Sequence, residues 1–160
     1  MSIQPGQPLP DVEIRVVDGD IRTARTGELF AGRRGVLFAV RGAFTPTCSN
    51  KHLPGYVAHY ADFRARDIDV MCLSVNDAYV MQAWGQAQHV PPGLILLADG
   101  NAGFTRALGL ELDGSGYGMG LRARRFALYA VNGKVEQVHI EAPGEFRVSA
   151  AEAMLDAIGG

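Results

Sequence analysis

The stretch Ile68-Asp-Val-Met-Cys-Leu-Ser-Val75 decides the fold, because it is almost continuously apolar after Asp69. A strand with one solvated face alternates between apolar and polar residues, whereas a strand that is covered on both faces does not. The stretch therefore predicts a central strand in the largely parallel part of a sheet. The same pattern makes Cys72 a buried, inert cysteine within that strand.

Further strands and helices alternate on either side of this stretch. Apolar, β-branched runs predict strands at Val12–Val17, Gly35–Val40, Gly93–Ala98, Phe126–Val131 and Val135–Ile140. Asn132-Gly133, between the last two, is typical of a hairpin turn. Apolar residues at helical spacing predict helices that start near Leu53, Val80 and Ala151, with a shorter one over Asn101–Leu108. The expected fold class is α/β, with a central mixed sheet flanked by helices in a single domain spanning residues 1–160.

Two helix starts carry recognisable cap signals. Ser149-Ala-Ala-Glu152 has the spacing of a capping box, in which the serine and glutamate side chains each bind a free backbone amide. Asn76-Asp77 predicts the cap of the helix that contains Val80.

Composition and charge exclude several classes of protein. The chain has 160 residues, 48% of them apolar and 20% charged, with a formal net charge of −2. That balance argues against nucleic-acid binding, which normally needs a basic surplus. No apolar run approaches the ~18–20 residues of a membrane span, and the first residues lack the pattern of a signal peptide. We therefore expect a cytoplasmic protein with no nucleic-acid or membrane partner.

Two cysteines cannot form a disulfide scaffold or a four-thiolate zinc site.

The segment from Val40 to Tyr56, VRGAFTPTCSNKHLPGY, places Cys48 where its thiol should ionise. Thr45 and Pro46 fit the N-cap and first position of a helix, which puts Cys48 at about the third position. The helix dipole supplies ~0.3–1 kcal/mol there. Lowering the thiol pKa by one to two units takes ~1.4–2.7 kcal/mol, so a nearby guanidinium is needed as well. A small cysteine that merely packs at a helix start remains an alternative at this point.

The segment Gly42–Tyr56 resembles the active site of peroxiredoxins, most closely the peroxiredoxin-5-type (atypical redoxin) branch. The segments Cys72–Met81, Ala83–Gly85, Leu94–Asp99 and Gly120–Tyr129 agree with that branch in order, so the resemblance covers essentially the whole chain. It implies a thioredoxin-like fold, a homodimer, and a thiol-dependent peroxidase that reduces hydrogen peroxide and alkyl hydroperoxides. The implied role is antioxidant defence and cell redox homeostasis, with no cofactor and no metal.

The resemblance also assigns roles to three catalytic residues. Cys48 matches the peroxidatic cysteine, which becomes a sulfenic acid. Thr45 matches the threonine that hydrogen-bonds the thiolate and the peroxide, and Arg125 matches the arginine that orients the peroxide. Strand alternation puts Arg125 on the opposite face from Arg124 and Phe126, and a buried arginine is costly unless it meets an anion. A solvated run of charges is the alternative for these arginines.

Two departures from the family pattern affect the expected activity. Arg41 stands where the family has a proline that shields the thiol, so we expect a lower but not abolished rate. The final loop, Glu141–Ala150, contains no resolving cysteine. The sequence therefore predicts a one-Cys enzyme that an external thiol resets, with glutathione and glutaredoxin as first choice and thioredoxin as second.

Other functions remain open at this point. A non-catalytic thioredoxin-like module for binding or redox sensing would also suit Cys48, with Arg41 marking a lost peroxidase activity. His52, four residues after Cys48, allows a Cys-His hydrolase, although a structural hydrogen bond near the pocket is the favoured interpretation. Cys48, His52 and His59 lack a fourth metal ligand at a recognised spacing. Asp113–Gly120 lacks the order of a phosphate-binding loop and predicts a mobile loop beside the pocket.

Overall fold

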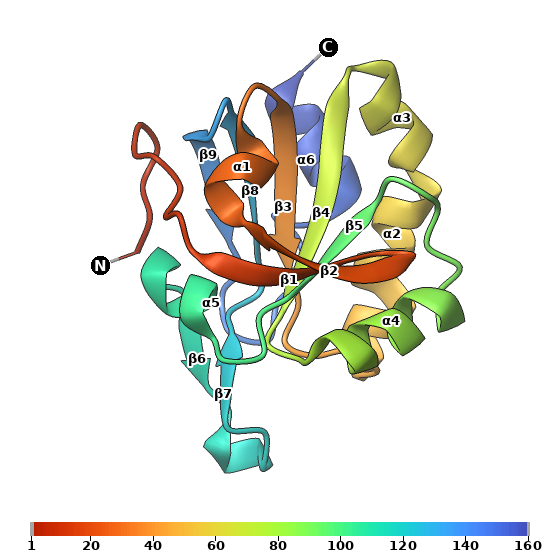
Figure 1. Cartoon of the computed structure of the whole chain (residues 1–160), viewed down its shortest axis with the longest axis vertical. Helices are drawn as coiled ribbons and strands as arrows, with labels where there is room; N and C mark the ends of the chain where they lie inside the picture. Colours follow the sequence, from red (N-terminus) through yellow and green to blue (C-terminus); the bar gives the residue numbers. More distant parts are fainter. Residues whose placement is uncertain (1, 160) are drawn as a thin grey trace.

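A seven-stranded mixed sheet organises the computed structural model, which describes residues 2–159 (Figure 1). Its strands run in the order β2-β1-β5-β4-β3-β8-β9. Their bounds are β1 Glu13–Asp18, β2 Asp20–Arg25, β3 Arg34–Ala39, β4 Ile68–Ser74, β5 Ile95–Ala98, β8 Phe126–Val131 and β9 Lys134–Ile140. A separate two-stranded sheet pairs β6, Glu111–Asp113, with β7, Leu121–Ala123. The predicted domain also included Met1 and Gly160, which lie outside the described residues.

Strand β4 lies at the centre of the large sheet, as its sequence predicts. It pairs in parallel with β3 on one side and β5 on the other, while the remaining pairings of this sheet are antiparallel. Cys72 faces Phe38 of β3 and Leu96 of β5 across these pairings. Alternate residues of the strand enter different cores, Met71 on one face of the sheet and Cys72 on the other.

Helices cover both faces of the sheet (Figure 1). They are α1 Thr26–Phe30, α2 Leu53–Ala58, α3 Tyr60–Ala65, α4 Ala78–Ala87, α5 Gly103–Leu108 and α6 Ala151–Ile158, with a π-helical turn η1 at Cys48–His52 and a short 3-10 turn η2 at Ser115–Tyr117. The core that contains Cys72 also contains Cys48, together with Tyr56 of α2 and Trp84 of α4. The other core contains Phe30 of α1 and Phe104 of α5. The candidate thiol therefore lies on the face covered by α2, α3, α4 and α6.

Of the predicted hairpin turn and the helix caps predicted at Asp77 and Ser149, the structure confirms the first two and contradicts the third. Asn132 and Gly133 both have positive φ, 51° and 76°, as a tight hairpin turn requires. Asp77 caps α4 by accepting the Val80 N–H at 2.9 Å. The capping box at Ser149 is wrong: α6 starts without a side-chain cap, and the Ser149 hydroxyl donates to Glu141 instead. The helix starts one residue later than the box requires, with Ala150 as its N-cap, so Ser149 lies outside the cap position.

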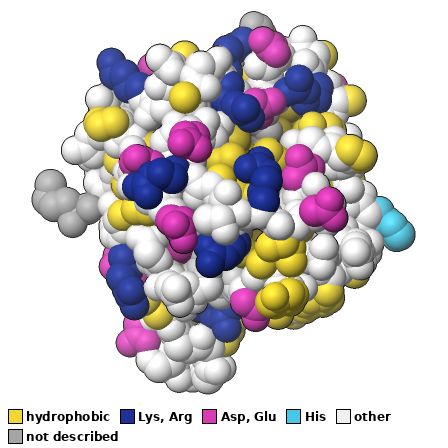
Figure 2. Space-filling view, viewed as in Figure 1, with side chains coloured by type: hydrophobic (Ala, Val, Ile, Leu, Met, Phe, Trp, Pro, Cys, Tyr) yellow, Lys and Arg dark blue, Asp and Glu magenta, His cyan; other side chains and the backbone are white. Residues whose placement is uncertain are grey.

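Charges of both signs are interspersed on the face shown in Figure 2, without a dominant basic area. Within residues 2–159, no helix has the length and apolar character needed to cross a membrane.

Candidate active site

Cys48 lies in the first turn of the helical segment that follows β3. Residues 46–47 are helical, so Cys48 occupies the third helical position, as the sequence predicts. Its side chain is fully buried. The turn then widens into the π-helix η1, in which the Leu53 N–H donates to the Cys48 carbonyl. Pro54 accounts for this widening, because it has no N–H for the Asn50 carbonyl and its ring would crowd that carbonyl in an α-helix.

Thr45 starts this turn through its backbone. Its carbonyl accepts the Ser49 N–H at 2.9 Å, but its hydroxyl donates to the Gly42 carbonyl at 2.7 Å. The predicted side-chain N-cap is therefore wrong, since the hydroxyl binds this carbonyl and no helix amide among the described residues. The hydroxyl instead lies beside the thiol of Cys48 and contributes to its ionisation.

Arg125, the residue immediately before β8, extends its side chain to the thiol of Cys48. Its Nη2 donates to the Cys48 Sγ at 3.1 Å, and its Nη1 lies 2.8 Å from the Nδ1 of His52. The side chain is buried, and the ring of Phe146 lies 5.9 Å from the guanidinium carbon. The predicted alternation of side chains along this strand is confirmed: Phe126 lies in the core on the other face of the sheet, whereas Arg125 is buried beside the sulfur of Cys48.

The surroundings of Cys48 favour its thiolate form. Burial alone would raise the pKa of this thiol. The positive charge of Arg125 opposes burial, and hydrogen bonds from Thr45, the Gly42 backbone and Arg125 act in the same direction. The net result is a Cys48 pKa below its ordinary value, as expected for a reactive cysteine.

His52 is a neutral hydrogen-bonding group that holds Arg125. Burial, and then the charge of Arg125, lower its pKa to about 3. A neutral imidazole has one N–H, and the donors of Arg125 face Nδ1, so Nδ1 accepts and Nε2–H donates to the Ser149 carbonyl at 3.1 Å. Both ring nitrogens are thus occupied by groups other than Cys48. This arrangement supports the structural interpretation of His52 and not a Cys-His hydrolase pair.

A carboxylate behind His52 fixes the Ser149 carbonyl. The Glu141 Oε2 accepts the Ser149 hydroxyl at 2.6 Å, the Ser149 N–H at 2.8 Å and the Arg147 N–H at 2.7 Å. Burial raises the Glu141 pKa, but these hydrogen bonds outweigh it and lower the pKa overall. Sequence reasoning missed Glu141, because its donors lie in an irregular loop whose path no periodicity predicts.

A His52→Gln variant is expected to change how stability depends on pH. The unfolded chain protonates His52 below its usual pKa of ~6.5, whereas the folded protein does so only near about 3. Wild-type stability therefore falls as pH drops below ~6.5, by about 2 kcal/mol between pH 7 and pH 5 from this residue alone. Urea unfolding at both pH values measures the difference.

The comparison with His52→Gln cancels the contributions of other groups. These include His59, whose pKa is raised by its hydrogen bond to Asp62 and which therefore acts in the opposite direction. An equal loss of stability in both proteins between pH 7 and pH 5 would show that His52 is charged in the folded state.

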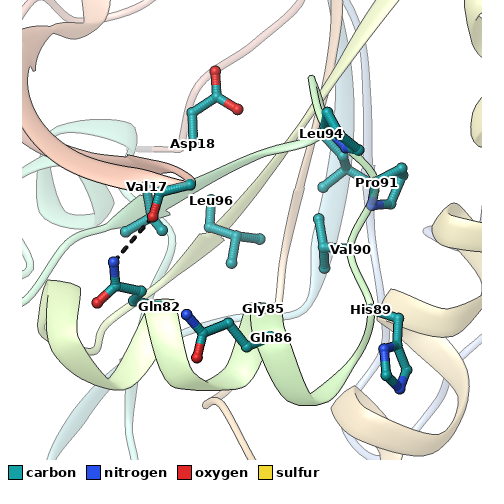
Figure 3. Close-up of a pocket in the computed structure, with 12 residues that line it drawn as sticks. Val17, Asp18, Gln82, Gly85, Gln86, His89, Val90, Pro91, Leu94 and Leu96 are labelled. Carbon is teal, nitrogen blue, oxygen red and sulfur yellow. Dashed lines mark hydrogen bonds between the residues drawn. The ribbon is translucent and has the colours of Figure 1, made fainter.

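The cavity next to Thr45 and Arg125 has a volume of about 270 Å³, and a separate, larger cavity of about 410 Å³ shares none of its described lining residues. Gly114, Tyr117 and Met119 of the glycine-rich loop line the smaller cavity, which confirms that this loop lies beside the pocket. The larger cavity lies between α4, β1 and β5, where Gln82 donates to the Gly19 carbonyl at 2.9 Å (Figure 3). Its lining includes neither Thr45 nor Arg125, which both line the smaller cavity, so the candidate chemistry belongs to the smaller one.

Cys72 and Trp84 lie near Cys48 but play structural roles. Cys72 is fully buried, and burial, followed by the charge of Cys48, raises its pKa well above the ordinary value, as expected for an inert thiol. Both cysteines are free. Trp84 of α4 lies against the Cys48 turn, where its indole N–H donates to the Ser49 hydroxyl at 2.9 Å. The side chain of Trp84 is fully buried.

Comparisons with known proteins agree with this geometry. The family described as Redoxin matches residues 4–155. Peroxiredoxin-2E, chloroplastic, of Arabidopsis thaliana is 45% identical over 163 residues, covering 98% of this chain and 70% of that protein. The structure of reduced Prx3 in complex with H₂O₂ from Vibrio vulnificus is 47% identical, with a TM-score of 0.92 and coverage of 98% and 99%. Peroxiredoxin 5 from Alvinella pompejana is 35% identical, with a TM-score of 0.86 and coverage of 98% and 97%.

These similarities confirm the predicted thioredoxin-like fold of peroxiredoxins and the predicted thiol peroxidase class. The chain therefore belongs to the redoxin family, as a peroxiredoxin of the type 2, peroxiredoxin-5-like subfamily with Cys48 as its peroxidatic cysteine.

Proposed function

We propose that this chain reduces hydrogen peroxide and small alkyl hydroperoxides in the cytoplasm, in antioxidant defence and redox homeostasis. Thr45, Cys48 and Arg125 are the catalytic residues of this proposal. The observation that carries it is the 3.1 Å contact between the Arg125 Nη2 and the Cys48 Sγ, which holds a thiolate beside a cavity. The two free cysteines suit a reducing compartment.

The reaction transfers two electrons from sulfur to the peroxide. The Cys48 thiolate attacks one peroxide oxygen, an S–O bond forms and the O–O bond breaks. The products are a sulfenic acid and a hydroxide or alkoxide, which takes up a proton to become water or an alcohol. The Arg125 guanidinium is a donor placed where negative charge moves between sulfur and oxygen. The Thr45 hydroxyl, which donates to the Gly42 carbonyl in the resting structure, becomes a second donor when it turns toward the peroxide.

An external thiol completes the proposed cycle. Cys72 is buried in β4, and the loop from Glu141 to Ala150 has no cysteine, so the chain offers no accessible second thiol. Glutathione with glutaredoxin is the proposed reductant, and thioredoxin is the second candidate. Turnover assays with each complete reducing system distinguish them: the proposed assignment fails if thioredoxin alone supports turnover.

The central experiment maps the product of one equivalent of hydrogen peroxide. A reagent that traps sulfenic acids is added immediately after oxidation, and digestion with mass spectrometry locates the adduct. The proposal expects the adduct on Cys48, together with consumption of one equivalent of peroxide. No peroxide consumption would favour the non-catalytic redox-sensing module instead.

We also propose that the active form is a homodimer. Phe44, Tyr79 and Tyr117 expose 56%, 77% and 77% of their surfaces, which is unusual for large aromatic side chains. Phe44 precedes Thr45, and Tyr117 lines the cavity, so an interface over them would adjoin the active site. Sedimentation equilibrium of wild type and a Tyr79→Ser variant tests this arrangement; a wild-type monomer at micromolar concentration contradicts it.

A further inference from the structure

Arg41 gives the cavity beside Cys48 a positive charge that the peroxidase reaction itself does not use. We propose that its guanidinium binds a carboxylate on the substrate, so that hydroperoxides with a small apolar body and a carboxylate react fastest. This inference rests on the proposed peroxidase function and specifies its substrate class.

Three arginines line the cavity, and two of them are already held by the protein. Arg122 donates from Nε to the Met119 carbonyl at 2.8 Å and from Nη1 to the Val75 carbonyl at 2.9 Å. Arg125 is held by Cys48 and His52, as described above. Arg41 is half-buried and makes no side-chain hydrogen bond or ion pair with any residue between 2 and 159. Its donors are therefore available to a ligand.

The walls of the cavity define the rest of that ligand. Apolar surface comes from Pro46, Leu112, Tyr117 and Met119, and no acidic residue lines this cavity in the described part of the chain. Its volume of about 270 Å³ lies just below the ~300–1,000 Å³ of sites for drug-sized molecules. An apolar body with one anionic group fits these walls, because a planar guanidinium pairs well with a carboxylate.

Two glutamates share a second cavity with Arg41, and neither forms an ion pair with it in the described part of the chain. Arg41 also lines a cavity of about 60 Å³ together with Glu141 and Glu145. The Glu141 Oε1 is buried and has no hydrogen-bond donor among the described residues, so Arg41 is not bonded to it. The Arg41 side chain thus borders both cavities, and it can bind a ligand in the larger one without breaking an ion pair.

A matched pair of substrates isolates the contribution of the carboxylate. Para-carboxycumene hydroperoxide and its methyl ester share the same peroxide and nearly the same body. Rapid mixing, acid quench and thiol alkylation give the rate of Cys48 oxidation by each, with hydrogen peroxide as a third arm. The wild type is expected to react at least tenfold faster with the acid than with the ester.

Variants of Arg41 then assign that preference. Arg41→Gln is expected to lower the acid-to-ester ratio about tenfold, and Arg41→Pro, which introduces the residue of the family pattern, to lower it similarly. Arg41→Lys keeps the charge without the planar fork and should retain an intermediate ratio. Arg15→Gln removes an exposed arginine that does not line the cavity, so its ratio should equal that of the wild type.

The outcomes separate this inference from the proposed function. Normal oxidation by hydrogen peroxide with equal rates for acid and ester overturns the inference alone. A preference that survives Arg41→Gln also overturns it. An Arg41 effect confined to reduction by glutathione, and absent with a neutral thiol, shows that the recognised carboxylate belongs to the reductant and overturns the substrate assignment. Absence of oxidation by every peroxide overturns the proposed function and this inference with it.

Discussion

Cys48→Ser is expected to abolish peroxide consumption, whereas Cys72→Ser retains most of it. A serine hydroxyl does not ionise near neutral pH, so the first variant lacks the nucleophile that attacks the O–O bond. Cys72 lies in the middle of β4, fully buried and with a raised pKa, and it takes no part in the proposed cycle. Consumption of one equivalent of hydrogen peroxide by each reduced protein measures the difference.

Cys72→Ala is the necessary companion to Cys72→Ser. A hydroxyl buried in β4 without a partner costs ~1–3 kcal/mol of stability, and a partly unfolded variant would lose activity for that reason alone. Alanine removes the thiol without adding a polar atom. A large loss of turnover in Cys72→Ala with an unchanged circular dichroism spectrum would overturn the one-Cys assignment.

Arg125→Gln is expected to slow the oxidation of Cys48 by at least ~100-fold, the usual effect of removing one preorganised donor from a developing charge. Two physical contributions combine here. The positive charge that opposes the burial of the thiolate is lost, so the Cys48 pKa rises, and the donor at 3.1 Å from Sγ is replaced by a neutral group. The acidic limb of the pH–rate profile should therefore move to higher pH.

Thiolate absorbance as a function of pH measures the pKa separately from the rate. Arg125→Lys is the matched control, because it keeps the charge but cannot contact His52 and Cys48 with one planar group. Relative to Arg125→Gln, Arg125→Lys should restore part of the lowering of the Cys48 pKa and a smaller part of the oxidation rate. An unchanged thiol pKa in Arg125→Gln would show that burial and the Thr45 and Gly42 hydrogen bonds set the ionisation without this charge.

The sequence predicts the centre of the fold better than its edges. The apolar run of β4 predicts a strand that is covered on both faces in the parallel part of the sheet, and β4 lies there, between β3 and β5. Strand β2 was missed, because Asp20–Arg25 lies at the edge of the sheet, where few of its side chains enter the core. Helix α1 and the small sheet of β6 and β7 were missed for another reason: they are short, and tertiary contacts hold them in place.

The site shows the same division between local and distant determinants. Cys48 at the third helical position and the inward direction of Arg125 follow from local spacing, and both are observed. The hydrogen-bonded chain from Glu141 through Ser149 to His52 joins residues that are about ninety positions apart in sequence, and no local pattern contains it. Ser149 illustrates the difficulty, since its local signal predicted a helix cap, whereas it binds the Glu141 carboxylate and accepts a hydrogen bond from the remote His52.

The contact between Trp84 and Ser49 has a practical consequence. The chain contains one tryptophan, so its fluorescence emission comes from a single known place. That indole is hydrogen-bonded to the residue immediately after the peroxidatic cysteine. A change in the shape of the Cys48 turn alters the polarity around the indole, and the protein therefore carries an intrinsic optical probe of its own oxidation state that needs no dye and no coupled enzyme.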